Sequence, residues 1–175
     1  MIHELPDDFE STLVRDPRAS AARLIDRLAE LGWTVAIAES LTGGLVVSSL
    51  VEVPGASRVL RGGIVAYDTA IKRSLLGVDA TLLEAHGAVH PRVARQMAEG
   101  VREALVVDGR PADVGIATTG IAGPGSPDGQ PVGTVHIAIS TPLGTRVDTL
   151  ALSGDREVIR QEAARIAVRH ALAAL

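Results

Sequence analysis

Apolar residues recur along the first third of the chain with two periods, that of an amphipathic helix and that of a buried strand. A run with helical spacing ends at Gly32, and its apolar positions are Leu24, Ile25, Leu28 and Leu31. The next apolar run, 34–38, has the length of a buried strand. After Gly43-Gly44 comes the run 45–51, which we interpret as a buried helix despite its valines. A strand that leads through a small-residue turn into a helix is typical of α/β proteins.

The remaining two thirds of the chain continue this alternation of elements. Pro54-Gly55 predicts a turn before a strand over 60–67. Asp68 or Thr69 is placed to cap a helix over 70–76 that Gly77 ends. The spacing predicts a short helix over 81–86 and a longer one from Pro91, whose apolar face consists of Val93, Met97, Val101 and Leu105.

Strands and a final helix are predicted in the last third. A strand over 112–118 is apolar on both faces, and the segment 119–130 is rich in Gly and Pro and is therefore expected to be a loop. The segments 134–140 and 146–152 flank the turn 141–144 and predict a hairpin. Asp155 is placed to cap a helix that runs to the C-terminus.

Together these elements predict one α/β domain. We expect a three-layer α/β/α sandwich with a mixed β-sheet, without internal repeats or an interdomain linker. The polar segment 1–19 is interpreted as an N-terminal arm, pinned by Phe9 and Leu13, and 20–175 as the domain. At 175 residues a single domain is the default.

The amino-acid composition argues against several classes of site and partner. The chain has no cysteine, which rules out disulfides, cysteine-based zinc sites and thiol nucleophiles. Aromatic residues make up 2% of the chain and the net charge is -4, so we expect no nucleic-acid partner. The start of the chain does not have the pattern of a secretion signal, and the longest uncharged stretch, 129–145, is broken by Pro and Gly. We therefore expect a cytoplasmic protein that does not associate with membranes.

Ser40 is the first candidate for chemistry. It follows a predicted strand and precedes a helix, where N–H groups of the first helical turn stabilise negative charge. Such an arrangement suits a phosphate or the oxyanion of an attacked carbonyl. The alternative is that Ser40 is simply a helix cap. The G-x-S-x-G motif of α/β-hydrolases is absent here.

Lys72 and Tyr67 form the second candidate. The chain has 16 arginines but a single lysine and a single tyrosine, and these two lie five residues apart. Lysine can act as a neutral base whereas arginine cannot. Lowering its pKa from about 10.4 to near 7 costs about 4 kcal/mol, which burial can supply. The alternative is a surface lysine beside a packed tyrosine.

Other polar groups give weaker indications. The glycine loop 119–125 would let backbone N–H groups approach an anion, or would simply connect two elements. Arg146 and Arg156 offer guanidinium groups for a phosphate, or are solvated. His86, at a predicted helix end, and His136, in a predicted strand, have no metal-ligand spacing, so we expect no metal. A serine nucleophile with a lysine base is the simplest hydrolytic set available.

Short motifs in order make the chain resemble the C-terminal domain family of the competence/damage-inducible protein CinA, which contains bacterial nicotinamide mononucleotide (NMN) deamidase. The resemblance covers nearly the whole chain after the arm. Its motifs are AESLTGG (38–44), VPGAS (53–57), GGIVAY (62–67), LLGV (75–78), EAHGAV (84–89), TGIAGP (119–124), PVGTV (131–135) and GDR (154–156).

The resemblance implies an amidohydrolase of pyridine nucleotide recycling that converts NMN and water to nicotinate mononucleotide and ammonia, without a cofactor. It implies that Ser40, Tyr67 and Lys72 match the family's catalytic set and that Thr119 and Arg156 match further site positions. We expect Lys72 to take the proton of Ser40 and Tyr67 to orient Lys72 or relay a proton. The expected oxyanion donors are the N–H groups of Thr42, Gly43 and Gly44. Ribose and phosphate are expected to bind the 119–124 loop, which includes Gly120, together with Arg156.

The sequence departs from the family pattern in three places. Residues 68–72 read Asp-Thr-Ala-Ile-Lys where Ser-Asn-Glu-Ala-Lys is common, Leu41 stands where Cys is frequent, and 125–130 is shorter. We expect these differences to alter the rim and the selectivity of the site while leaving the catalytic residue types intact. The nucleotide-processing domain that precedes this one in full-length relatives is not in this sequence, so its activity is not expected here.

Two other functions stay open. One is a non-catalytic nucleotide-sensing or protein-binding module linked to competence or DNA damage. The other is deamidation of a different small amide. For the enzyme we expect a homodimer.

Overall fold

The structure, a computed structural model, describes residues 17–126 and 129–175, so the predicted contacts of Phe9 and Leu13 lie outside the described residues. Helices and strands alternate at the start of this range, and a run of three helices and then a run of three strands follow. The elements are α2 (Pro17–Leu31), β1 (Val35–Glu39), α3 (Leu45–Val51), a 3₁₀ turn (Ala56–Arg58), β2 (Leu60–Val65), α4 (Thr69–Leu76), α5 (Ala80–His86), α6 (Pro91–Ala104), β3 (Val114–Gly120), β4 (Thr134–Thr141), β5 (Gly144–Ala151) and α7 (Arg156–Ala173).

The strands form one five-stranded mixed sheet in the order β2-β1-β3-β4-β5. β2, β1 and β3 are parallel neighbours, whereas β3-β4 and β4-β5 pair antiparallel. The last two strands form the predicted hairpin. Because β1, β2 and β3 run in the same direction, their carboxyl ends meet at one edge of the sheet.

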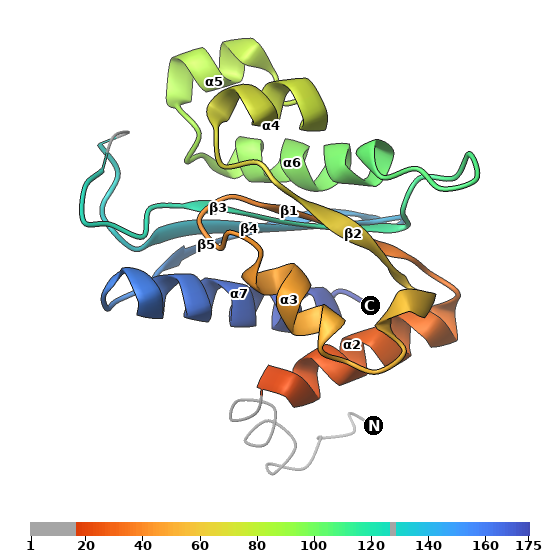
Figure 1. The fold of residues 1–175 in the computed structure, drawn as a ribbon. Helices are drawn as coiled ribbons and strands as arrows, with labels where there is room; N and C mark the ends of the chain where they lie inside the picture. The colour runs from red at the N-terminus through yellow and green to blue at the C-terminus, as the bar shows by residue number, and fades with distance from the viewer. Residues whose placement is uncertain (1–16, 127–128) are drawn as a thin grey trace, which may run out of the picture.

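Helices cover both faces of this sheet, with α4, α5 and α6 on one side and α2, α3 and α7 on the other (Figure 1). The predicted three-layer α/β/α fold is confirmed. The core is aliphatic and is divided by the sheet. In β1, for example, Val35 and Ile37 face the layer of α2, α3 and α7, while Ala36 and Ala38 face the opposite layer. This is the period of two that a strand buried on both faces requires.

The predicted helix ends are largely those observed. The carboxylate of Asp68 accepts the N–H of Ala70 at the start of α4, and Gly77, with φ 65°, ends that helix. The carboxylate of Asp155 accepts the N–H of Val158 and caps α7. These contacts satisfy backbone groups that a helix end otherwise leaves unpaired.

Several predicted boundaries differ from those observed: β2 ends at Val65 rather than at 67, and β5 begins at Gly144 rather than at 146. Two further differences have a clear physical reason. α2 begins at Pro17, inside the segment interpreted as an arm, and proline is well suited to a first helical turn. β3 continues through Thr119 and Gly120, which the Gly- and Pro-rich composition assigned to a loop. These two residues pair with His136 and Val135 of β4, and this antiparallel ladder extends the strand.

Within residues 17–126 and 129–175, no helix is both long enough and apolar enough to cross a bilayer.

Candidate active site

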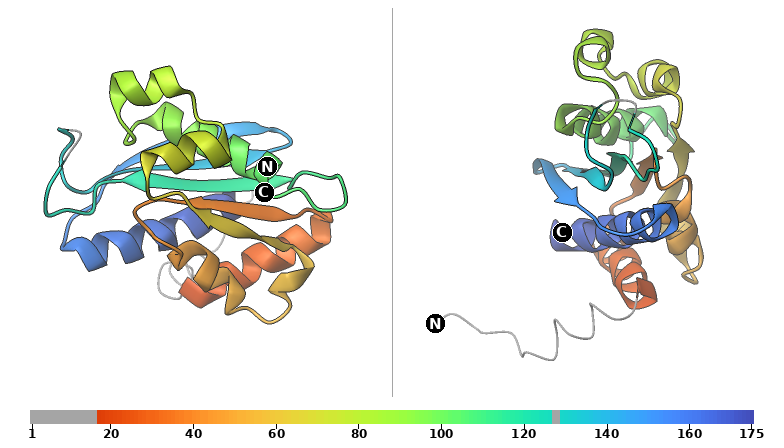
Figure 2. Two further views of the ribbon diagram at one scale, coloured as in Figure 1. Left: turned by 45° about the horizontal axis from the view of Figure 1, so that its top comes forward. Right: turned by 90° about the vertical axis from the view of Figure 1, so that its left-hand side faces the viewer.

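A pocket of about 380 Å³ lies at the sheet edge where the three parallel strands end. This is the end of the fold that faces the viewer in the right-hand view of Figure 2. Its volume is within the range of small-molecule sites. The lining residues are Ser40, Leu41, Tyr67, Thr69, Lys72, Ala88, Val89, Thr119, Gly120, Ile121, Ala122, Gly123, Gly125 and Arg156.

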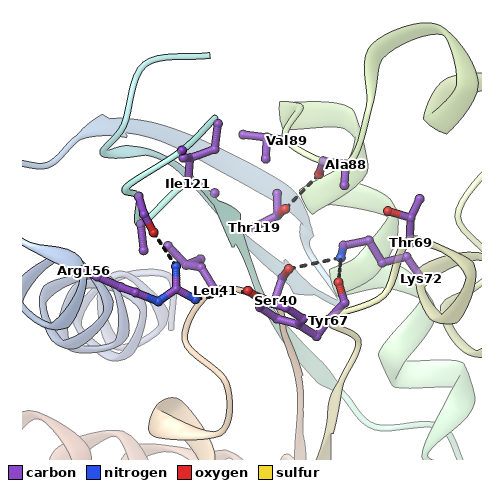
Figure 3. Close-up of a pocket in the computed structure, with 14 residues that line it drawn as sticks. Ser40, Leu41, Tyr67, Thr69, Lys72, Ala88, Val89, Thr119, Ile121 and Arg156 are labelled. Atoms are coloured by element: carbon purple, nitrogen blue, oxygen red, sulfur yellow. Dashed lines mark hydrogen bonds between the residues drawn. The ribbon is translucent and has the colours of Figure 1, made fainter. Parts of the chain in front are cut away.

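Lys72 and Ser40 meet inside this pocket. Lys72 is 1% exposed, so the alternative of a surface lysine is wrong. Its Nζ lies 3.1 Å from Ser40 Oγ and donates to the carbonyl oxygen of Tyr67 at 3.3 Å (Figure 3). It also donates to the carbonyl oxygen of Ala66 at 2.7 Å. The amine therefore lies between the candidate nucleophile and two groups that accept hydrogen bonds but cannot donate them.

Tyr67 lies at the mouth of the pocket and is 63% exposed. Its backbone carbonyl, rather than its ring, accepts the bond from Lys72. The phenol oxygen accepts a hydrogen bond from Arg156 Nη2 at 3.1 Å, and Arg156 Nη1 donates to the Gly123 carbonyl at 2.6 Å. Arg156 thus links the segment after β2 to the glycine loop after β3, at the first residue of α7.

The structure does not bring Thr42, Gly43 and Gly44 into the pocket lining. The N–H of Gly43 donates to the Ser40 carbonyl, and the N–H of Gly44 donates to the Glu39 carboxylate at 2.8 Å. The Thr42 hydroxyl bonds the Thr118 hydroxyl at 2.8 Å, with both residues fully buried. The start of α3 does stabilise a negative charge, as expected, but that charge belongs to Glu39.

Thr119 and Gly120 line the pocket, as their predicted role requires. The Thr119 hydroxyl donates to the Ala88 carbonyl at 2.8 Å and so connects β3 to the segment between α5 and α6 (Figure 3). His136, the partner of Thr119 in β4, is buried, and this burial lowers its pKa, with a smaller contribution from His90. Burial therefore favours the neutral imidazole of His136, which does not itself line the pocket.

Arg146 does not line the pocket, and its side chain is 68% exposed, as the alternative of a solvated arginine expects. It pairs with Ile139 near the start of β5, whereas the pocket lies toward the end of that strand. Its guanidinium donates to Asp148 at 3.0 Å instead. In the part of the chain that the structure describes, no group of three or more His, Asp or Glu side chains is arranged to hold a metal ion.

Two buried or partly buried groups that support the site had no predicted role. Glu39 accepts three N–H groups at the start of α3, and Arg160 of α7 donates to the carbonyls of Leu41 and Thr42. A carboxylate at the end of the otherwise apolar run VAIAE was a usable signal for Glu39. Arg160 lies in a helix with many charges, and nothing in the sequence distinguishes it from its neighbours.

Comparison with known proteins identifies the family. The model of the CinA C-terminal domain matches residues 18–175. A CinA-like protein of Anaeromyxobacter sp. (strain Fw109-5) is 52% identical over 145 residues, which is 82% of this chain and 34% of that protein. The chain spans about a third of the length of the curated relatives it matches.

Two solved structures share the whole fold. The competence/damage inducible protein CihA from Agrobacterium tumefaciens is 34% identical with a TM-score of 0.83, over 98% of each chain. A competence-damaged protein (CinA) superfamily protein from Escherichia coli is 32% identical with a TM-score of 0.86, over 100% of this chain and 96% of its own. The match in sequence and in fold leads to one conclusion: this chain belongs to the CinA C-terminal domain family.

Proposed function

We propose that the protein is an amidohydrolase that deamidates NMN to nicotinate mononucleotide and ammonia, with Ser40 as nucleophile and Lys72 as base. One observation carries the proposal. Lys72 Nζ contacts Ser40 Oγ and two backbone carbonyls in a buried position. The resemblance described above supplies the substrate, and the names of the relatives do not state one.

The two carbonyls orient the amine for proton transfer. A neutral amine has two N–H groups and one lone pair. When the carbonyls of Ala66 and Tyr67 accept the two hydrogens, the lone pair points toward the hydroxyl of Ser40. Burial favours the neutral amine because desolvation disfavours the charged form.

The reaction then follows in two halves. Lys72 takes the hydroxyl proton while Ser40 Oγ bonds to the carboxamide carbon, and the resulting ammonium returns a proton to the leaving nitrogen, which departs as ammonia. In the second half Lys72 takes a proton from water, the hydroxide attacks the acyl carbon, and Ser40 recovers its proton as nicotinate mononucleotide leaves. The amine is a base and then an acid in each half.

The oxyanion needs N–H donors. The N–H groups of Gly43 and Gly44 already donate hydrogen bonds to the Ser40 carbonyl and the Glu39 carboxylate. Leu41 lines the pocket directly after the nucleophile, and its N–H donates no hydrogen bond within residues 17–126 and 129–175. We assign the oxyanion to this N–H, the position that α/β-hydrolases also use. Arg156 and the loop 119–123 would hold the ribose and phosphate, since a guanidinium has five N–H groups and two are in use.

The test is ammonia release from NMN by the purified protein, measured in the presence of EDTA. We expect turnover that is lost in Lys72→Met, which keeps the length of the side chain without a base. Nicotinamide riboside, which lacks the phosphate, should show a higher KM. Wild-type activity in Lys72→Met would contradict the mechanism, and release from another amide but not from NMN would contradict the substrate.

A further inference from the structure

We propose that Glu39 and Arg160 are positioning residues that together fix the Ser40 turn, defined as residues 40–44. Neither side chain lines the pocket, so both act through Ser40. The inference rests on the proposed function for its link to catalysis. It concerns groups on the face of the sheet opposite to Lys72.

Strand alternation explains how neighbouring residues serve opposite layers. Val35 and Ile37 of β1 face α2, α3 and α7, and Glu39 continues this series. Its carboxylate lies at the start of α3. Ser40 follows and points to the other layer, where it meets Lys72 of α4. The direction of Ser40 therefore depends on how the chain turns between β1 and α3.

Glu39 holds the outgoing side of this turn. Its Oε2 accepts the N–H groups of Gly44 at 2.8 Å and Val46 at 3.2 Å, and its Oε1 accepts that of Val47 at 2.9 Å. The side chain is 0% exposed. A buried carboxylate is costly unless hydrogen bonds compensate it, so displacing these three N–H groups is unfavourable.

Arg160 holds the middle of the turn from α7. Its Nε donates to the Leu41 carbonyl at 2.8 Å and its Nη2 to the Thr42 carbonyl at 3.1 Å. The guanidinium lies against Gly43, where an added Cβ would come 3.2 Å from Nη2 and the φ of +60° disfavours other residues. The planar guanidinium of Arg160 thus binds two successive carbonyl groups, those of Leu41 and Thr42.

These contacts fix the peptide planes of the turn. In a peptide unit the C=O and the N–H point in opposite directions. Holding the carbonyls of Leu41 and Thr42 toward α7 therefore sets the planes that follow them. Glu39 fixes the N–H groups of Gly44, Val46 and Val47 on the α3 side of the turn. Ser40 is therefore held from one face of the sheet, while Lys72 Nζ lies 3.1 Å from its Oγ on the other face.

The experiment compares Arg160→Lys with Arg165→Lys. Arg165 is a matched control because it lies on the same helix but binds Glu162 of that helix. Lysine keeps the positive charge but cannot reproduce the two parallel hydrogen bonds of the planar guanidinium. For NMN deamidation we expect kcat to fall about 10- to 100-fold in Arg160→Lys, with KM nearly unchanged. Arg165→Lys should retain the wild-type kcat, and Glu39→Gln should behave like Arg160→Lys.

A second readout does not depend on turnover. Hydrogen exchange of the amides of Gly44, Val46 and Val47 should become faster in Arg160→Lys than in Arg165→Lys, at comparable unfolding midpoints. Wild-type kcat or unchanged exchange in Arg160→Lys would overturn the proposal, even if Glu39→Gln fails to fold. A wild-type protein that releases no ammonia from NMN would instead refute the proposed function, and exchange would still decide whether the two residues hold the turn.

Discussion

The hydrogen bond between the hydroxyls of Thr42 and Thr118 connects the Ser40 turn to β3, and its contribution to stability can be measured. The two oxygens are 2.8 Å apart and both residues are fully buried. Replacing either threonine by valine keeps the shape and leaves the other hydroxyl buried without this partner. Each single change should therefore cost about 1–3 kcal/mol of the free energy of unfolding.

The double variant should be more stable than the sum of the single effects predicts. When both hydroxyls are removed, no unsatisfied group is left, and the change is expected to be nearly neutral. In this double-mutant cycle, the coupling free energy between the two threonines should then be at least about 1 kcal/mol. With an m-value of about 2 kcal/mol/M, each single variant should lower the urea midpoint by about 0.5–1.5 M.

Urea unfolding of the wild type, both single variants and the double variant gives the four free energies of unfolding that the cycle needs. If the double variant loses as much stability as the two single variants together, the two hydroxyls do not satisfy one another. The KM for NMN should stay at the wild-type value, because neither threonine lines the pocket. A raised KM with unchanged stability in Thr42→Val would restore the sequence-based assignment of Thr42 to substrate binding.

Three further predictions concern packing, the pocket mouth and pH. A Cβ at Gly115 would lie 1.9 Å from a backbone carbonyl of α6, so Gly115→Ala should lower the free energy of unfolding by about 1–3 kcal/mol in urea. Tyr67→Phe removes one of the two acceptors that hold Arg156 and should raise KM more than it lowers kcat. Burial lowers the pKa of His136 below 6.5, so the unfolded chain binds its proton first. Unfolding stability should therefore fall as the pH drops below about 6.5, and His136→Asn should weaken this dependence.

Each of these has a control or a contradicting result. Gly125→Ala, where a Cβ meets nothing within 4 Å, should leave the urea midpoint unchanged. Loss of kcat at constant KM in Tyr67→Phe would assign the phenol to the chemical step instead. An identical pH profile in His136→Asn and the wild type would contradict the role given to burial.

Much of the fold could be predicted because local signals and long-range packing agree. The caps Asp68 and Asp155 and the glycine stop at 77 mark helix ends by themselves. The end of β3 was missed because Thr119 and Gly120 have the composition of a loop, and only their pairing with β4 makes them a strand. Such pairing depends on a segment distant in the sequence.

For the candidate site, sequence reasoning identified residue types better than contacts. The scarcity of lysine and tyrosine drew attention to Lys72 and Tyr67, and the structure buries the first at the pocket beside Ser40. The sequence alone could not show that the phenol oxygen of Tyr67 bonds Arg156, 89 residues away. Nor could it show that Glu39 already occupies the start of α3, since both depend on how separate elements pack.

The central claim is that Ser40 is the nucleophile, and the most direct measurement is the rate of ammonia release from NMN by Ser40→Ala. Ser49→Ala, on α3 and outside the pocket, is the matched control. The account predicts that kcat in Ser40→Ala falls by at least about 10³-fold while NMN still binds, because the nucleophile is lost and the ribose and phosphate contacts are kept. Ammonia release by Ser40→Ala within tenfold of the Ser49→Ala rate would contradict it.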